Sequence, residues 1–280
     1  MWFASANGLS RYDSKSNTFI KFTAENHLDL ESNIAIHLTL DKSGNLWGGT
    51  FKSGVYHLTN TYDFTSIESA QFDNYKHSPD SINSLSSNLI SSITCSSDGT
   101  IWVASDSGLN SISDSGEVEQ YTKEDGLLSD KFINLIADDG HTLWASTMGQ
   151  GIMAMNTETE EFQFFNQADG LESNNFLLNS GYMSEEGVLF LGTDAKTQII
   201  DTKAVFDIEA GPSSFDFREV HYLTSDIKEE LRGGDQIEIP YDHRSFNISF
   251  STLQFFRSEK THYEYRIQPC LLYTSPSPRD

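Results

Sequence analysis

The side chains that could do chemistry are mainly carboxylates and histidines. The chain has 280 residues, of which 41 are Asp or Glu and 8 are His. Acidic turns, such as those at residues 41–44 and 138–140, resemble fragments of calcium loops. A calcium loop, however, needs five or more oxygen ligands at a set spacing such as Asp-x-Asp-x-Asp-Gly. None of these turns has that spacing, so ordinary turn chemistry explains them better.

Histidine and cysteine spacing gives no metal signature either. The eight histidines show no His-x-x-x-His or His-Glu pair; they are His27, His37, His57, His77, His141, His221, His243 and His262. Cys95 and Cys270 are the two cysteines, too few for a disulfide framework or a zinc site. We therefore predict no metal site and no cofactor, although scattered residues could still converge in space.

Nucleophile and phosphate motifs are missing from the sequence. There is no Gly-x-Ser-x-Gly elbow and no Gly-x-x-x-x-Gly-Lys loop. Residues 232–235 (Arg-Gly-Gly-Asp) resemble part of the Gly-Gly-Asp-Glu-Phe signature of diguanylate cyclases, but only 45 residues follow them. A cyclase needs a complete α/β domain around that motif, so we interpret it as a hairpin turn. We predict no catalytic residues.

Charge and composition restrict the partners. The formal net charge is −23, which repels nucleic acid and anionic membrane surfaces. Aromatic residues make up 12% of the chain, which predicts a folded protein. The sequence has no apolar run near the roughly 18 residues of a membrane span and does not open on a signal peptide. Either the protein is cytoplasmic or its true start is missing, and the repeats described next favour the second.

An internal repeat is the strongest feature of the sequence. Trp2, Trp47, Trp102 and Trp144 follow one another at spacings of 45, 55 and 42, and Phe190 lies 46 residues further on. Each tryptophan is followed three residues later by Ser or Thr, and then by a glycine and an aliphatic residue; these glycines are Gly8, Gly54, Gly108 and Gly151. The fifth copy lacks the glycine. Tryptophans can stack on sugars, but recurrence at one position favours a structural role in the core.

One repeat predicts four short strands. In the third copy these are residues 89–95, 101–104, 108–112 and 118–121, with a positive-φ turn at Asp98 and Gly99. Four antiparallel strands in about 40–50 residues are typical of a propeller blade. Helical repeats would need long stripes with 3.6-residue spacing. We predict an all-β chain with a partial β-propeller of about five four-stranded blades, near residues 2–45, 46–100, 101–142, 143–188 and 189–208; an array of β-sandwiches is the alternative.

The repeat resembles a known family. The phrases Gly-x-Leu-Trp-x-x-Thr, Gly-Leu and Asp-Gly-Leu-x-Ser-Asn are similar to the two-component-regulator propeller repeat, over residues 1 to about 205. The chain departs from the pattern in an insertion near residues 61–70 and in the fifth copy. The resemblance implies seven-bladed propellers, often two in tandem, in the periplasmic sensor half of membrane-bound signalling proteins.

A different pattern follows the repeats. Residues 209–216 are predicted to be a linker, and strands are expected at 218–223, 236–240, 246–250, 253–255 and 263–267, as part of a β-sandwich. Residues 217–268 resemble a truncated immunoglobulin-like Y_Y_Y module, which follows these propellers in the same family; the matching residues are Asn247, Phe250, Leu253, Tyr263 and Tyr265. Residues 269–280 look like a translated sequencing adapter, so we expect a non-native tail in which Cys270 has no meaning.

These observations favour a sensor over an enzyme. We predict the extracytoplasmic ligand-sensing region of a membrane-bound signal-transduction protein, and the resemblance implies that it lies on the periplasmic or extracellular side. It would relay a signal to a histidine kinase, diguanylate cyclase or transcription regulator outside this chain. The expected ligand is an unknown small molecule or carbohydrate, and no residues are assigned to it. We expect no nucleic acid partner and membrane contact only through missing segments. The full-length protein is expected to form a dimer. The alternatives are a propeller enzyme, such as a polysaccharide lyase or glycosidase, and a secreted binding or scaffold propeller.

Overall fold

A computed structural model describes residues 1–27, 30, 34–61 and 66–203 with their side chains, together with the backbone of five strands between residues 215 and 275. Contacts divide the chain into two compact units, Met1–Val205 and Phe206–Asp280. The division lies close to residue 208, where the repeats are expected to end. The two units are described separately.

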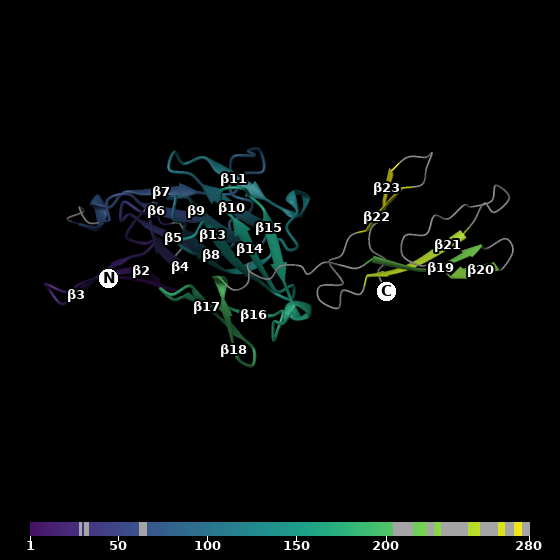
Figure 1. Cartoon of the computed structure of the whole chain (residues 1–280). Coiled ribbons are helices and arrows are strands. Elements are labelled where there is room, and N and C mark those ends of the chain that lie inside the picture. The colour runs from purple at the N-terminus through teal and green to yellow at the C-terminus, as the bar shows by residue number, and fades with distance from the viewer. Residues whose placement is uncertain are drawn as a thin grey trace. The chain divides into compact units, whose positions relative to one another are not determined.

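The N-terminal unit consists of five antiparallel sheets in chain order, which we call blades 1 to 5 (Figure 1). Blade 1 contains β1 (Trp2–Ser5), β2 (Gly8–Asp13) and β3 (Thr18–Phe22). Blade 2 contains β4 (Ala35–Leu40), β5 (Leu46–Thr50), β6 (Val55–Leu58) and β7 (Phe72–Tyr75). Blade 3 contains β8 (Ile90–Cys95), β9 (Ile101–Ser105), β10 (Gly108–Ile112) and β11 (Val118–Tyr121). Blade 4 contains β12 (Phe132–Ala137), β13 (Thr142–Thr147), β14 (Ile152–Asn156) and β15 (Phe162–Phe165). Blade 5 contains β16 (Phe176–Met183), β17 (Val188–Thr193) and β18 (Thr197–Asp201).

The first strands of successive four-stranded blades lie next to each other, and the later strands of each blade follow outward in sequence order. This radial arrangement is that of propeller blades. Three 3₁₀ turns, η1 (Ile67–Ser69), η2 (Lys123–Asp125) and η3 (Gln167–Asp169), lie in the connections. The expected all-β propeller architecture is therefore confirmed, although blades 1 and 5 have three strands rather than four within the described residues.

The sheets begin one strand earlier than the sequence units. Trp47, Trp102 and Trp144 lie on β5, β9 and β13, the second strand of each four-stranded blade. The units predicted near residues 46–100, 101–142 and 143–188 begin on or just before that second strand. These bounds assign the first strand of each sheet to the preceding unit, although it is hydrogen-bonded to the second strand. The reason is that the tight turn before each tryptophan continues the sheet as a hairpin, whereas the longer polar connections after β7, β11 and β15 separate one sheet from the next.

The hydrophobic core lies between neighbouring blades. Each of four buried clusters combines apolar side chains from two successive sheets. Between blades 3 and 4, for example, Trp102 and Leu109 pack with Leu143 and Met153, and all four are at most 3% exposed. A blade therefore buries both of its faces only when a neighbour lies on each side.

Polar side chains also connect the blades at their first strands. The backbone amide of Leu135 on β12 donates to Ser92 Oγ on β8 at 3.0 Å. Asn134 donates to the carbonyl of Leu177 at 2.9 Å and accepts from the amide of Ser180 at 3.1 Å, linking β12 to β16. The first and second strands are out of register by a bulge in blades 2 to 5. Such bulges leave backbone groups for these inter-blade bonds.

The C-terminal unit is described by its backbone strands alone. β19 (Phe215–Tyr222) lies between β20 (Ile227–Glu230) and β21 (Phe246–Thr252), and β22 (Tyr263–Arg266) pairs with β23 (Leu272–Ser275). The expected strands near 218–223, 246–250 and 263–267 are present, whereas β20 was not predicted. β19 begins inside the predicted linker, and β23 lies inside the segment expected to be a non-native tail. Residues 272–275 include the β-forming types Tyr and Thr, which is consistent with their pairing. That the tail is non-native stays a prediction.

Other expectations lie outside the described residues. These include most of the linker, the Gly-Gly-Asp turn, Cys270 and the strands at 236–240 and 253–255. The immunoglobulin-like identity of the C-terminal unit stays a prediction. In the part of the chain that the structure describes, no helix has the length and hydrophobicity that crossing a membrane requires.

Candidate functional site

The repeat tryptophans are core residues. Trp47, Trp102 and Trp144 are between 1% and 5% exposed. Trp2 is only partly buried; its ring lies 5.8 Å from that of Phe22. Phe190, the fifth copy, is also partly buried. The three buried indoles have no face free for stacking on a sugar.

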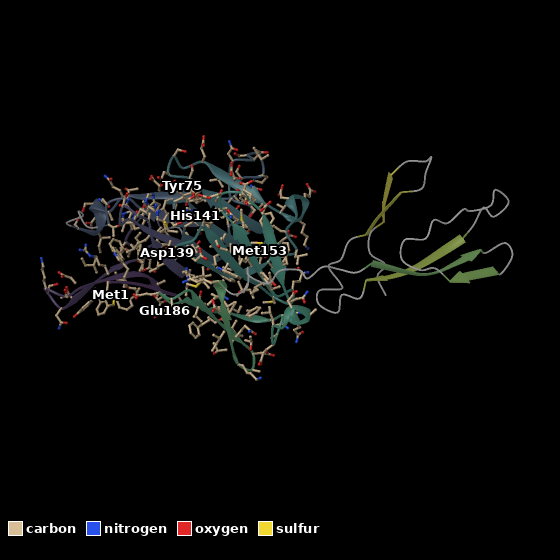
Figure 2. The ribbon with its side chains drawn as sticks, in the orientation of Figure 1. Met1, Tyr75, Asp139, His141, Met153 and Glu186 are labelled. Atoms are coloured by element: carbon tan, nitrogen blue, oxygen red, sulfur yellow. The ribbon has the colours of Figure 1, made fainter. Side chains whose placement is uncertain are left out.

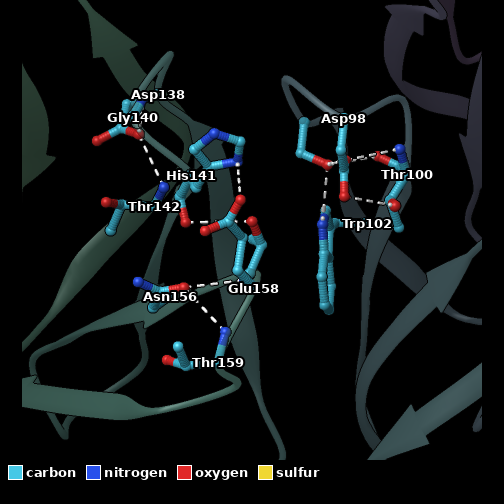
Figure 3. Close-up of polar contacts among 12 residues, drawn as sticks. Asp98, Thr100, Trp102, Asp138, Gly140, His141, Thr142, Asn156, Glu158 and Thr159 are labelled. Carbon is cyan, nitrogen blue, oxygen red and sulfur yellow. Dashed lines mark hydrogen bonds and ion pairs between the residues drawn. The ribbon is translucent and has the colours of Figure 1, made fainter.

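The acidic turns hold these indoles in place. The indole N–H of Trp47 donates to Asp41 at 3.1 Å, and that of Trp144 to Asp138 at 3.5 Å. In blade 3, Trp102 donates instead to Ser96 Oγ at 3.2 Å, and Ser96 donates to Asp98 (Figure 3). Each carboxylate also accepts backbone amides of its own turn. The turn carboxylates are therefore occupied by structural hydrogen bonds.

These hydrogen bonds also fix the charge of the turns. Burial by itself would raise the pKa of Asp98, but hydrogen bonds from Ser96 and Thr100 outweigh it and hold the pKa below its ordinary value. The pKa of Asp41 is lowered in the same way, since burial is outweighed by hydrogen bonds from Trp47 and Asn45. Both side chains stay ionised at neutral pH as acceptors.

The repeat glycines are required by a close approach of two strands. All four have positive φ, from +73° at Gly54 to +138° at Gly108. A Cβ at Gly151 would lie 2.0 Å from the carbonyl oxygen of Phe165, the last residue of the outer strand. The equivalent distances to the aromatic residue that ends the outer strand are 2.2, 2.1 and 2.6 Å for Gly8, Gly54 and Gly108. Only glycine fits both the backbone angle and the space.

The Ser or Thr of each copy closes the same turn. Its hydroxyl donates to the carbonyl of the repeat glycine, as in the 2.8 Å bond from Thr147 to Gly151. In the fifth copy Thr193 makes the equivalent bond to Lys196 at 2.9 Å, so the turn survives without the glycine. The repeat residues therefore occupy equivalent scaffold positions in five sheets and do not come together as one site.

Among the described residues, a cavity between blades 3 and 4 is the candidate functional site. Its volume is about 700 Å³, within the usual range of ligand pockets. It lies between β11, the outer strand of blade 3, and the hairpin formed by β14 and β15, with residues 82 and 83 on a third side. Chemistry-bearing residues of three separate segments meet here, chiefly Asn83, Glu119, Tyr121 and Glu160.

Tyr121 is at the centre of the polar part of this cavity. Its side chain is 8% exposed, and its hydroxyl lies 2.8 Å from Glu160 Oε1 and 3.3 Å from Glu119 Oε2. Burial and the hydrogen bond to Glu160 raise the pKa of the Tyr121 hydroxyl, so it remains a donor. Asp125 is engaged elsewhere, because it accepts the amide of Thr122 at 2.8 Å as part of a capping box.

Sequence reasoning missed this cavity. The spacing within the repeat indicates strands at 118–121 and 162–165, but Glu119 and Glu160 are separated by 41 residues and no local motif connects them. Glu160 has a left-handed backbone with φ of 59°, unusual for a residue other than glycine. That irregular turn brings its side chain toward β11.

Comparison with known proteins supports the architecture. Residues 84–107 match the family model described as two component regulator propeller. The chain contains a two-component-regulator propeller repeat. The match spans the loop before β8, then β8, β9 and the turn to Gly108, which are the elements that position Trp102. A search of curated proteins found no match.

Solved structures show the same fold. One, described as the extracellular domain of the hybrid two-component system BT3049 from B. thetaiotaomicron, superposes with a TM-score of 0.76 at 21% identity, covering 99% of this chain and 37% of that one. The extracellular domain of BT4673 from the same organism gives 0.57 at 19% identity, covering 99% and 43%. Virginiamycin B lyase from Staphylococcus aureus gives 0.50 at 14% identity, covering 71% and 60%. The chain therefore spans less than half of the length of the two extracellular domains.

Proposed function

We propose that this chain is part of the extracytoplasmic, ligand-sensing region of a membrane-bound signal-transduction protein, and that it relays a signal without catalysing a reaction. The observation that supports it most is that a superposition on the extracellular domain of BT3049 covers 99% of the chain. The propeller repeat at residues 84–107 points the same way.

The described residues fit a binding role. Their turn carboxylates are occupied by structural hydrogen bonds, and Glu119 and Glu160 share the hydroxyl of Tyr121 as a donor. A glycosidase instead needs two carboxyl groups on opposite sides of the bond it cleaves. The cavity between blades 3 and 4 is where we place the ligand, with a kinase, cyclase or transcription regulator as the output domain of the full-length protein.

Ligand binding without turnover is the test. The purified chain is screened with small molecules and oligosaccharides by thermal shift, and each compound that raises the melting temperature is recovered and analysed for chemical change. A ligand that binds only the folded state raises the melting temperature by mass action, and we expect it to be recovered intact.

The enzyme alternative makes the opposite prediction. Virginiamycin B lyase, an enzyme of similar fold, is the reason for testing this alternative. If a polysaccharide is cleaved, and Glu160→Gln abolishes the cleavage while the protein stays folded, the sensor proposal is wrong.

A further inference from the structure

The cavity between blades 3 and 4 also has apolar residues in its lining. The partly buried Phe162 lines it from β15, and Ile82, on the third side, is 84% exposed. An isoleucine so exposed offers surface to an apolar group of a ligand. The cavity can therefore accept the body of an organic molecule rather than only a hydrated ion.

The polar part of the cavity, around Tyr121, is negative. Glu119 and Glu160 both approach the Tyr121 hydroxyl, at 3.3 and 2.8 Å. One hydroxyl has one proton, so it can donate fully to only one of the two carboxylates at a time. Two like charges are thus held close together with a single neutral donor between them.

The described lining of the cavity supplies no cation to balance these charges. Among the described residues that line the cavity, none is Lys, Arg or His. The nearest lysine in sequence, Lys123, is paired with Asp130 at 3.3 Å. Within the described part of the chain, no group of His, Cys, Asp and Glu side chains is arranged to hold a metal ion. A ligand that carries its own cation would therefore meet two carboxylates and no competing positive side chain among the described lining residues.

We propose that the cavity binds a small organic molecule that carries a protonated primary amine. The ammonium group would donate hydrogen bonds to Glu119 and Glu160, and the apolar body would lie against Phe162 and Ile82. An ammonium has three donors, enough to satisfy both carboxylates, and an aromatic face attracts a cation nearby. The signalling meaning of this binding rests on the proposed sensor function, but the binding itself does not.

Three compounds that share a phenylethyl group and differ in charge test the charge requirement. Phenethylammonium, neutral 2-phenylethanol and anionic 3-phenylpropanoate are titrated into the 280-residue chain by calorimetry at pH 7. We expect saturable binding of phenethylammonium, at least about tenfold weaker binding of the alcohol, and no binding of the carboxylate. Binding should also weaken as salt is raised, because the carboxylates are solvent-exposed. Equal affinity for the alcohol, or no binding of the ammonium compound, would overturn the proposal.

Charge-neutral variants test the location. Glu160→Gln and Glu119→Gln should each weaken phenethylammonium binding about tenfold, the loss of one hydrogen bond to a charged group. Glu186→Gln removes the same charge from an exposed turn of blade 5 that does not line the cavity, labelled in Figure 2, and should leave the affinity unchanged. Equal losses in all three variants would mean that net charge, not this cavity, attracts the cation.

The two proposals fail separately. If the ammonium compound does not bind but another ligand raises the melting temperature and is recovered intact, the amine proposal is wrong and the sensor proposal stands. If the ammonium compound binds and is chemically converted, the site is correct and the non-catalytic function is wrong.

Discussion

Replacing Trp102 with alanine should destabilise the N-terminal unit strongly. The indole is 3% exposed, and its ring centroid lies 5.6 Å from that of Tyr121. It packs in the same cluster as Leu143 and Met153 of blade 4, so its removal opens a cavity between two blades. The backbone of β9 is hydrogen-bonded on both sides, to β8 and β10, which limits how far the site can collapse.

The magnitude follows from the loss of a large buried side chain. Truncating a buried Trp to Ala costs about 3–5 kcal/mol. The lost hydrogen bond to Ser96 adds little, because the Ser96 hydroxyl can still donate its proton to Asp98 or to the carbonyl of Thr100 and is not left unpaired. We therefore expect a decrease of about 3–5 kcal/mol in the free energy of unfolding.

Urea denaturation followed by circular dichroism measures this change without relying on tryptophan fluorescence. Trp102→Phe is the matched variant: it keeps a buried ring and should cost about 1–2 kcal/mol, for one hydrogen bond and a small cavity. Trp2→Ala, at a partly buried position, should cost at most about 2 kcal/mol. A cost below about 1 kcal/mol for Trp102→Ala would refute the placement of this indole between the blades.

Three further predictions concern the scaffold and its surface. Gly151→Ala should lower the free energy of unfolding by about 3 kcal/mol or more, because positive φ and the 2.0 Å approach to a carbonyl act together. Gly126→Ala, with φ of +101° and open space around it, should lower it by only about 1–2 kcal/mol. Equal free energies of unfolding for the two variants would contradict the clash. The pKa of His57 is lowered by burial despite its neighbouring carboxylates, so the unfolded chain takes up the proton first. The contribution of neutral His57 to stability should be fully present above about pH 6.5 and should be lost as the pH falls below that value. A pH series of melting curves should therefore show a smaller decrease in melting temperature for His57→Gln than for the unchanged chain. Ile199, 58% exposed on the outer face of blade 5, should promote association between copies of the chain. Ile199→Lys should increase the monomer fraction in size-exclusion chromatography. An unchanged monomer fraction would show that this face does not mediate association.

Strands and turns could be predicted because their causes are local. The alternation in residues 89–95 and the turn at Asp98 and Gly99 predict a hairpin that the structure contains as β8 and β9. The recurrence of Trp102 and its equivalents predicted a repeated core position, since one side-chain type at one place in every unit requires one environment. The net charge of −23 is a property of the sequence alone, and the expectation drawn from it, that nucleic acid is no partner, stays a prediction.

Sheet boundaries depended on more than the repeat. The predicted strands of the third copy placed Trp102 on the second strand, as the structure has it, whereas the predicted unit near residues 101–142 began on that strand. The repeat unit looks the same from whichever strand it is counted, so hydrogen bonding across the tight turn before each tryptophan decided where each sheet begins. β20 and β23 each pair with the strand just before them in the chain, with Tyr222 opposite Ile227 and Arg266 opposite Leu272, so these two pairings are local ones that the sequence analysis did not predict.

The candidate site depended on tertiary structure alone. Ile82, Glu119 and Glu160 belong to three segments whose sequence order carries no sign of their proximity. They meet because blades 3 and 4 pack face to face, which brings the outer strand of one blade beside a hairpin of the next. Local sequence determines which strands form and which way their side chains alternate, whereas the space between two sheets exists only after both have packed.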